Sequence, residues 1–197
     1  MKNNHSNSAL IVLDLINGIT ESEHFKPYIT QHKIIQKVNQ LIAHARENKQ
    51  LIIFVKIGFS DNYAELAHRS PLFIHNKPNN YLKLSESSTE FHPELDYRSN
   101  DIVVIKHRVN AFYATSLEAI LNANEIDHLI LCGVSTNLAV EGTARDAHDR
   151  NYKVTVVKDA CAANSSDNQE KSISILSMIT EIKTVDEILE TRGCERT

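Results

Sequence analysis

Hydrophobic residues in this chain gather in short unbroken runs separated by longer segments of mixed polarity. The runs fall at residues 9–15, 51–57, 101–106, 128–132, 153–157 and, more briefly, 183–185. Continuous apolarity, in contrast to strict alternation, is typical of parallel strands that are covered on both faces. The pattern therefore predicts a strand at each run.

Most segments between these runs carry apolar residues at three- and four-residue steps, which predicts amphipathic helices. These helices span residues 31–49, 115–123, 136–150 and 167–180. Strands that alternate with helices through short links form βαβ units. The predicted fold class is α/β, a doubly wound, mostly parallel six-stranded sheet with helices on both faces in a Rossmann-like three-layer arrangement.

Residues 58–100 interrupt this alternation because they contain no long periodic segment and are punctuated by Pro71, Pro78 and Pro93. An irregular stretch of this length inside a compact domain usually covers a pocket or contacts another subunit. The sequence shows no repeat and no second set of elements. We therefore predict a single domain over residues 1–197.

Composition and charge narrow the class of protein. A hydrophobic content of 42% with 23% charged residues is ordinary for a soluble globular chain. The net charge of −4 leaves no basic excess for nucleic acid or a membrane surface. No segment resembles a membrane span or a signal peptide, and three scattered cysteines suit a reducing compartment. We expect a cytoplasmic protein.

Residues that can carry chemistry stand where the predicted strands end. Asp14 lies near the end of the first strand, Lys106 closes the third, and the fourth runs into a turn at residues 133–139. In doubly wound sheets the ligand site lies beyond the strand C-termini, where the strand order reverses. A buried carboxylate beside a lysine is common in catalytic pairs, and a helix N-terminus can stabilise an oxyanion. Taken singly, each residue also has a structural interpretation, as a loop cap or a solvated lysine.

Motifs around these positions resemble the isochorismatase-like hydrolase family, often called cysteine hydrolases. The matching segments are Ile-Val-Leu-Asp-Leu-Ile-Asn at 11–17, Val-Ile-Lys-His-Arg-Val-Asn-Ala-Phe at 104–112, Cys-Gly-Val-Ser-Thr-Asn-Leu-Ala-Val-Glu-Gly-Thr-Ala-Arg-Asp-Ala at 132–147 and Asp-Ala-Cys-Ala-Ala at 159–163. The resemblance implies that Asp14 is the general base and that Lys106 lowers a thiol pKa and helps to bind substrate. A cysteine in that family attacks an amide or related carbonyl, and water resolves the acyl intermediate.

The turn after the fourth strand departs from the family pattern. Gly-Val-x-Thr-x-x-Cys places the nucleophile at position 139, where this chain has Ala139. The resemblance still implies an oxyanion site built from Val134, Ser135 and Leu138, often with a cis peptide between Val134 and Ser135. A methyl group, however, cannot attack a carbonyl.

Three explanations of Ala139 stay open. In the first explanation, the chain is a natural hydrolase that uses Asp14 without a thiol. Vinyl-ether hydrolysis by the isochorismatase branch is an example, because there the aspartic acid protonates an alkene carbon. Alternatively, it is a natural binding protein on the same scaffold, or a variant in which cysteine was replaced by alanine to stop catalysis. We expect Cys132 and Cys161 to be packing residues rather than substitute nucleophiles.

Candidate substrate-binding residues flank the second and third strands. Phe59, Tyr63 and Phe112 are candidates for the walls of a ring-accepting pocket, and Arg108 and Asn110 for binding a carboxylate or carbonyl. For each of these residues, an ordinary role in the core or in a solvated loop fits the sequence about as well as substrate binding.

No metal or cofactor is expected. Nicotinamidases of this superfamily bind a metal through Asp-x-His, but Asp61 is followed two residues later by Tyr63. This makes nicotinamide a less favoured substrate. No glycine-rich phosphate loop is present.

We therefore predict a small-molecule hydrolase acting on amide, other C–N or vinyl-ether bonds, with a non-catalytic binding protein as the alternative. By analogy with the family, we expect a homo-oligomer.

Overall fold

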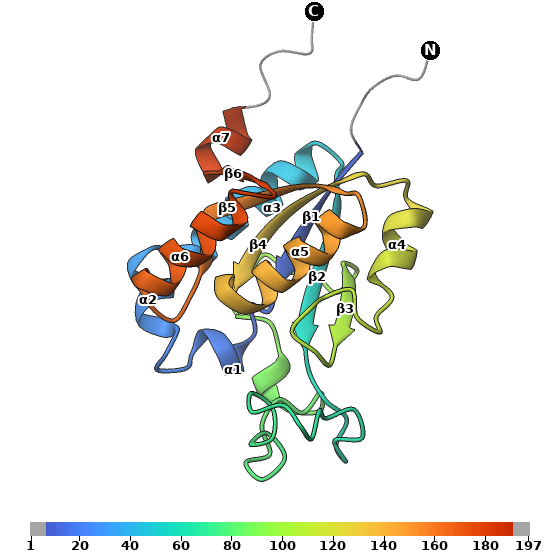
Figure 1. Ribbon diagram of the computed structural model, residues 1–197, viewed down its shortest axis with the longest axis vertical. Helices are drawn as coiled ribbons and strands as arrows, with labels where there is room; N and C mark the ends of the chain where they lie inside the picture. Colours follow the sequence, from blue (N-terminus) through green and yellow to red (C-terminus); the bar gives the residue numbers. More distant parts are fainter. Residues whose placement is uncertain (1–6, 191–197) are drawn as a thin grey trace, which may run out of the picture.

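The computed structural model describes residues 7–190 and contains a parallel sheet in the order β3-β2-β1-β4-β5-β6 (Figure 1). The strands are β1 (Ser8–Leu13), β2 (Leu51–Ile57), β3 (Ile102–Lys106), β4 (His128–Val134), β5 (Lys153–Ala162) and β6 (Glu181–Lys183). All neighbouring strands pair in parallel. The predicted α/β fold class is confirmed.

Helices cover both faces of the sheet. Helix α3 (Ile34–Glu47) packs with α7 (Val185–Leu189) behind the sheet in Figure 1, and α5 (Glu141–Asp149) packs with α6 (Ser166–Leu176) in front. Helix α4 (Leu117–Ala123) connects β3 to β4. Within the described residues, no helix is both long and apolar enough to cross a membrane.

The central strands are buried from both sides, which explains their continuous apolarity. Leu10, Ile11, Val12 and Leu13 of β1 are at most 2% exposed and belong to the main core. Helix α3 buries a stripe of apolar residues at helical spacing against the same core. Burial of such side chains contributes about 1.5–3 kcal/mol each, so the pattern read along the chain is also what stabilises the sheet.

The strand order reverses between β1 and β4. From β1 the chain proceeds to β2 and β3 on one side, and the next strand, β4, returns to the other side of β1. Leu13 pairs with Gly133, and Ile57 pairs with Lys106, so the ends of these strands lie at one edge of the sheet. This is the switch point at which ligands bind in such sheets.

Two short helices before β2 were not predicted. They are α1 (Asn17–Thr20) and α2 (Lys26–Gln31). The predicted helix over residues 31–49 was wrong at its start, because Lys33 has a positive φ of 54° and separates α2 from α3. Strand β5 runs five residues beyond its predicted end at Val157, and β6 ends at Lys183, where the prediction placed its start.

The first part of the segment 58–100 folds beyond the C-terminal ends of β2 and β3, at the bottom of Figure 1. From about residue 91 the chain returns along the sheet and α3 to the start of β3, with Leu95 in the main core. The segment 58–100 consists mainly of turns, with one 3-10 helix, η1 (Ser87–Thr89). The segment has a small core of its own, the second cluster, in which its residues pack against Ile16 and Ile57. The members from the segment are Phe59, Tyr63, Leu66, Phe73 and Leu82.

Candidate active site

Asp14 and Lys106 form a buried ion pair at the switch point. Asp14 follows β1 and Lys106 ends β3, and the two side chains are 4% and 1% exposed. Lys106 Nζ lies 2.7 Å from Asp14 Oδ2, while Asp14 Oδ1 accepts a hydrogen bond from the Ile57 N–H at 2.8 Å. Lys106 Nζ also donates to the Arg108 carbonyl oxygen at 3.1 Å. The sequence prediction that these ends of β1 and β3 meet agrees with this geometry.

Burial governs the acidity of Asp14. Removal of the carboxylate from water raises the pKa of Asp14 above its ordinary value, although the Lys106 ammonium and the Ile57 N–H act in the opposite direction. The side chain is therefore easier to protonate than an exposed aspartate. A carboxylic acid that holds a proton near the working pH can act as a general acid.

The turn after β4 has an unusual backbone. Gly133 has a φ of 116°, and the peptide bond between Val134 and Ser135 is cis. A π-helical turn, η2 (Thr136–Val140), follows and leads directly into α5. The N–H groups of Leu138 and Val140 both donate to the Ser135 carbonyl oxygen, at 3.2 and 3.1 Å. Cis geometry was part of the expectation drawn from the family resemblance.

Gln169 of α6 supports this turn from behind. Its Oε1 accepts from the Thr136 hydroxyl at 2.6 Å and from the Ala163 N–H at 3.0 Å, and its Nε2 donates to the Lys158 carbonyl oxygen at 3.0 Å. Because all these groups are part-buried or buried, the loss of one partner would leave others unpaired. The turn is therefore fixed by both the sheet and α6.

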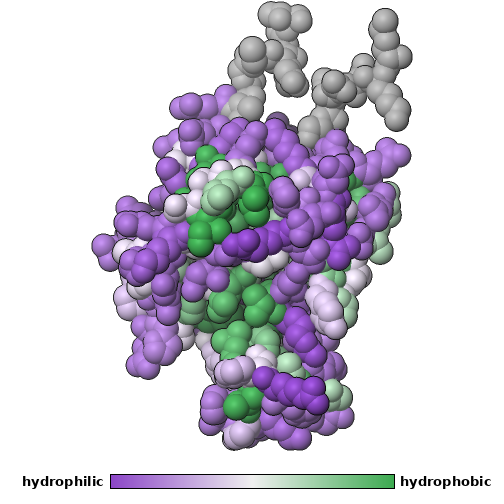
Figure 2. All heavy atoms as spheres, in the orientation of Figure 1, coloured by the Kyte–Doolittle hydropathy of each residue, from purple (hydrophilic) through white to green (hydrophobic). Residues whose placement is uncertain are grey.

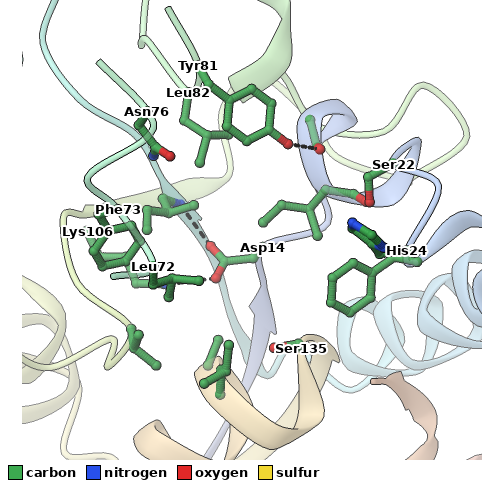
Figure 3. Close-up of a pocket in the computed structure, with 17 residues that line it drawn as sticks. Asp14, Ser22, His24, Leu72, Phe73, Asn76, Tyr81, Leu82, Lys106 and Ser135 are labelled. Atoms are coloured by element: carbon green, nitrogen blue, oxygen red, sulfur yellow. Dashed lines mark hydrogen bonds and ion pairs between the residues drawn. The ribbon is translucent and has the colours of Figure 1, made fainter. Parts of the chain in front are cut away.

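A cavity of about 280 Å³ opens between the ion pair, the turn and the segment 58–100 (Figure 3). Asp14 and Lys106 line it together with Ser135, Leu138 and Ala139, and the rest of its lining is mostly apolar. The remaining lining residues are Gly18, Ile19, Ser22, His24, Phe25, Ile57, Leu72, Phe73, Asn76, Tyr81, Leu82 and Val109. The volume suits a small organic molecule.

Figure 2 shows two apolar areas on a largely hydrophilic face, one higher on the main body and one between the main body and the lower segment. Leu72 and Leu138 line the cavity although they are 50% and 41% exposed. The Tyr81 hydroxyl donates to the Gly18 carbonyl oxygen and thereby ties the segment 58–100 to α1. The cavity thus has walls from several parts of the chain.

None of the five residues predicted to bind substrate lines this cavity, so that prediction was wrong. Phe59 and Tyr63 are 0% and 3% exposed and lie in the second cluster behind its wall. Phe112 belongs to the main core, where its ring lies near Tyr152 and beneath the Arg150 guanidinium. The aromatic rings that do line the cavity come from Phe25, Phe73 and Tyr81.

Arg108 and Asn110 hold the protein scaffold. The Arg108 guanidinium donates to the carbonyl oxygens of Glu65 and His107, at 2.7 and 2.6 Å. Asn110 Nδ2 donates to Asp146 Oδ2 at 2.6 Å, and its Oδ1 accepts from the Phe112 N–H at 2.7 Å. These bonds connect the strand β3 exit to the segment 58–100 and to α5, away from the cavity lining.

Sequence reasoning missed the contributions of α1, of the link from α1 to α2, and of the tip of the segment 58–100. Short helices carry too little periodicity to be recognised, although Pro27 in the first turn of α2 was a usable signal. Asn76 and Tyr81 stand in an irregular stretch with no strand end to mark them. Their place on the wall follows from the packing of the second cluster.

The described cysteines are both remote from the chemistry of the cavity. Cys132 and Cys161 are buried, and neither lines the cavity. Burial raises the pKa of the Cys132 thiol well above its ordinary value and that of Cys161 to about 12. Cys194 lies outside the described residues. Within residues 7–190, no group of three or more His, Cys, Asp or Glu side chains is placed to hold a metal ion.

Comparisons with known proteins identify the family of this chain. A family model described as the isochorismatase domain matches residues 8–187. The chain is 34% identical over 191 residues to the uncharacterized isochorismatase family protein YecD of Escherichia coli O157:H7, covering 94% of this chain and 96% of that protein. It is 32% identical over 173 residues to the ureidoacrylate amidohydrolase RutB of Klebsiella pneumoniae, covering 78% and 72%.

Solved structures give the same result. N-carbamoylsarcosine amidase from Thermoplasma acidophilum superposes with a TM-score of 0.76 at 27% identity, covering 91% of this chain and 97% of that one. A cysteine hydrolase from Pseudomonas syringae pv. phaseolicola has a TM-score of 0.84 at 24% identity, covering 96% and 94%, and shows the likeness of fold. The chain belongs to the isochorismatase family, whose members are hydrolases.

Proposed function

We propose that this protein is a small-molecule hydrolase in which water, and not a protein thiol, attacks the substrate. One observation carries the proposal. The Asp14 carboxylate lies in the cavity beside Lys106, and neither described cysteine reaches the lining. Ala139, which also lines the cavity, stands where the family resemblance implies the nucleophile. These features support acid–base catalysis by Asp14 and give no support to covalent catalysis by a cysteine.

Asp14 would move a single proton. Its protonated form donates that proton to the alkene carbon of a vinyl ether, and water adds to the resulting oxocarbenium ion while the carboxylate accepts a proton from the water. The hemiketal formed then breaks its C–O bond, with its hydroxyl proton passing to the leaving oxygen, to give a carbonyl compound and an alcohol. For a C–N bond, the ionised carboxylate takes a proton from the attacking water and returns it to the leaving nitrogen. The raised pKa of Asp14 supports the first sequence, because it favours the acid form.

Lys106 and the turn would stabilise the charge that develops. We assign the backbone N–H group of Ser135, which lines the cavity, to a developing oxygen anion. Of the other two predicted donors, the Leu138 N–H already donates to the Ser135 carbonyl oxygen, and Val134 does not line the cavity. The ammonium of Lys106 balances the carboxylate whenever Asp14 is ionised, since the two are 2.7 Å apart. The names of RutB and of the Thermoplasma amidase support C–N hydrolysis as one reaction to assay.

The test is turnover of a panel of amides, hydroxamates and vinyl ethers by the purified protein. Asp14→Asn should lower kcat by about 10²–10⁴-fold, the usual contribution of a positioned acid or base. Asp167→Asn, which affects an exposed ion pair with Lys171 on α6, is the control and should leave kcat unchanged. Absence of any turnover that depends on Asp14 would refute the proposal.

A binding role without catalysis is the second candidate, and the methyl group of Ala139 in the cavity wall favours it. Ala139→Cys discriminates between the two. A gain of amidase activity identifies an inactivated cysteine hydrolase, of natural or engineered origin. No gain, together with saturable ligand binding by the unchanged protein and no turnover, supports the binding role.

Two expectations about the setting of the protein stay predictions. We propose a homo-oligomer in the cytoplasm, supported by family analogy and by exposed apolar side chains such as Tyr113, which is 61% exposed. Sedimentation of the purified protein and fractionation of cells that express it would test the two parts separately. A monomer, or a protein found outside the cytoplasm, would contradict them.

A further inference from the structure

Gln169 of α6 connects β4 and β5 at the point where their backbone pairing stops. The last paired residues are Val134 and Ala162, and both strands end there. Gln169 Oε1 then accepts from the Thr136 hydroxyl at 2.6 Å and from the Ala163 N–H at 3.0 Å. A single side-chain oxygen thus joins the turn after β4 to the residue that follows β5.

Backbone partners determine which way the Gln169 amide faces. Its Nε2 donates to the Lys158 carbonyl oxygen at 3.0 Å, which can only accept, and the Ala163 N–H can only donate. The amide oxygen must therefore face Thr136, whose hydroxyl supplies the proton. Gln169 and Thr136 are 7% and 0% exposed, so the loss of either partner would leave a buried polar group unpaired. The Thr136 side chain is thus held in one direction by a group that is itself fixed.

Thr136 is next to Ser135, whose backbone N–H we assign to the developing oxygen anion. Ser135 lines the cavity below Asp14 in the view of Figure 3, whereas Gln169 does not line this cavity. Gln169 can therefore act on the reaction only through the turn. A donor to a developing charge is effective when it is held at hydrogen-bond distance from the place that the charged oxygen will occupy. A misplacement of about 1 Å can cost about 100-fold in rate.

We infer that Gln169 is a positioning residue, which holds the Ser135 N–H toward the cavity through its hydrogen bond to Thr136. The inference rests on the proposed function, since it takes the Ser135 N–H to stabilise the oxygen anion. The alternative is a purely structural role, in which Gln169 only pairs the backbone groups of Lys158 and Ala163. That role predicts lower stability without a specific effect on turnover.

Two variants remove the contact between Gln169 and Thr136 from either side. Gln169→Leu removes every hydrogen bond of the side chain, whereas Thr136→Val removes only the hydroxyl and leaves the Ala163 N–H paired. Each should lower kcat about 10–100-fold and leave KM within about twofold, because the N–H acts on a charge that is present only in the transition state. The double variant should have nearly the kcat of Gln169→Leu, since the two residues act through one bond. Losses of kcat that multiply in the double variant would overturn the inference.

Thr155→Val is the matched control for lost stability. Thr155 on β5 is 0% exposed, and its hydroxyl oxygen lies 2.8 Å from His128 Nε2 and donates to Glu181 Oε2 at 3.1 Å. None of these three residues lines the cavity. Thr155→Val and Gln169→Leu should both lower the urea midpoint of unfolding, but only Gln169→Leu should lower kcat. An equal effect of the two variants on kcat would show that the role of Gln169 is structural. If Gln169→Leu does not fold, Thr136→Val replaces it in this comparison.

A spectroscopic measurement separates this inference from the proposed hydrolase function, because it requires no turnover. The backbone amide signal of Ser135 in NMR spectra should shift in Gln169→Leu, where the substitution lies on another element, and should stay in place in Thr155→Val. A shifted signal in a protein without Asp14-dependent turnover supports the positioning contact and refutes the reaction. Asp14-dependent turnover that Gln169→Leu does not lower refutes the positioning role and leaves the reaction.

Discussion

Asp14 adopts a backbone conformation that few non-glycine residues adopt, with a φ of 52°. Left-handed geometry ends β1 at this point and is tolerated best by Asn and Asp. The side chain is directed to Lys106 and the Ile57 N–H, while the backbone N–H still donates to the Val55 carbonyl oxygen at 2.8 Å. Local strain of about 1–3 kcal/mol at such residues is typical of functional sites.

The ionisation of Asp14 should make stability depend on pH. Because its pKa is raised above 3.8 in the folded protein, the folded state holds the proton more tightly than the unfolded chain. The stability that Asp14 contributes is therefore fully present below pH 3.8 and is lost as pH rises through the folded pKa. The free energy of unfolding of the unchanged protein should fall relative to that of Asp14→Asn over this window.

Urea unfolding of both proteins between about pH 4 and pH 8 measures the difference. The same comparison with the surface control Asp167→Asn should show no such trend. A difference that grows in favour of the unchanged protein as pH rises would contradict the direction of the pKa shift.

Sequence reasoning at the residue scale located the ion pair but not the substrate wall. Asp14 and Lys106 are polar residues at the ends of apolar runs, so strand periodicity places them at one edge. Phe59 and Phe112 are apolar, and the sequence indicates only that they are buried, not which of the two clusters receives them. Asn76 lines the cavity from an irregular stretch, so no strand end or helical period marks it in the sequence.

At the scale of elements, Gly133 allows β4 to approach β1 before the turn. A Cβ atom at this position would collide with the carbonyl oxygen of Leu13, its neighbour in the register of β1 and β4, and its φ of 116° is unfavourable for other residues. Gly142 on α5 has a different environment, since a Cβ there would meet Val109 Cγ1 at 3.5 Å.

Gly133→Ala should therefore lower the free energy of unfolding by about 1–3 kcal/mol or more, and displace the turn that carries Ala139. Gly142→Ala is the matched control and should be neutral or raise stability by about 0.5–1 kcal/mol, because alanine favours the helix. Urea midpoints of the two variants provide the comparison. Equal stability of both variants would show that the approach of β4 to β1 does not require glycine.

The long elements were predictable because their periodicity extends over many residues. Strands β1, β2 and β4 and helices α3 and α5 each repeat one pattern over six or more positions. Helices α1 and α2 have four and six residues, so a period of 3.6 is scarcely expressed. The C-terminal extension of β5 comes after an irregularity in the register between β4 and β5. It depends on pairing with β4, and the residues of β5 alone do not reveal that pairing.

At the scale of the whole molecule, the second cluster makes the segment 58–100 a fixed wall. Phe59 is fully buried there and its ring lies near those of Tyr63, Phe73 and His107. Of these rings, Phe73 reaches the cavity lining. An irregular segment can therefore hold a site in place when its turns share a core with the sheet.

Phe59→Leu should lower the free energy of unfolding by about 1–3 kcal/mol and also raise the KM for any substrate, because Phe73 and Asn76 lose support. Phe112→Leu, in the main core beside Tyr152, should cost a similar amount of stability and leave KM unchanged. Urea unfolding and steady-state kinetics are measured on both variants. A KM raised equally by both would mean that the second cluster has no specific connection to the cavity.

The cavity draws on β1, β3, the turn after β4 and the segment 58–100, which lie far apart along the chain and meet only after folding. A molecule that fills it consequently binds the native state and has no counterpart site in the unfolded chain. Such a ligand adds about 2.7 kcal/mol to stability at a concentration 100 times its Kd. Thermal melting against a compound library is therefore an assay for the natural substrate, and it works whichever bond the protein breaks.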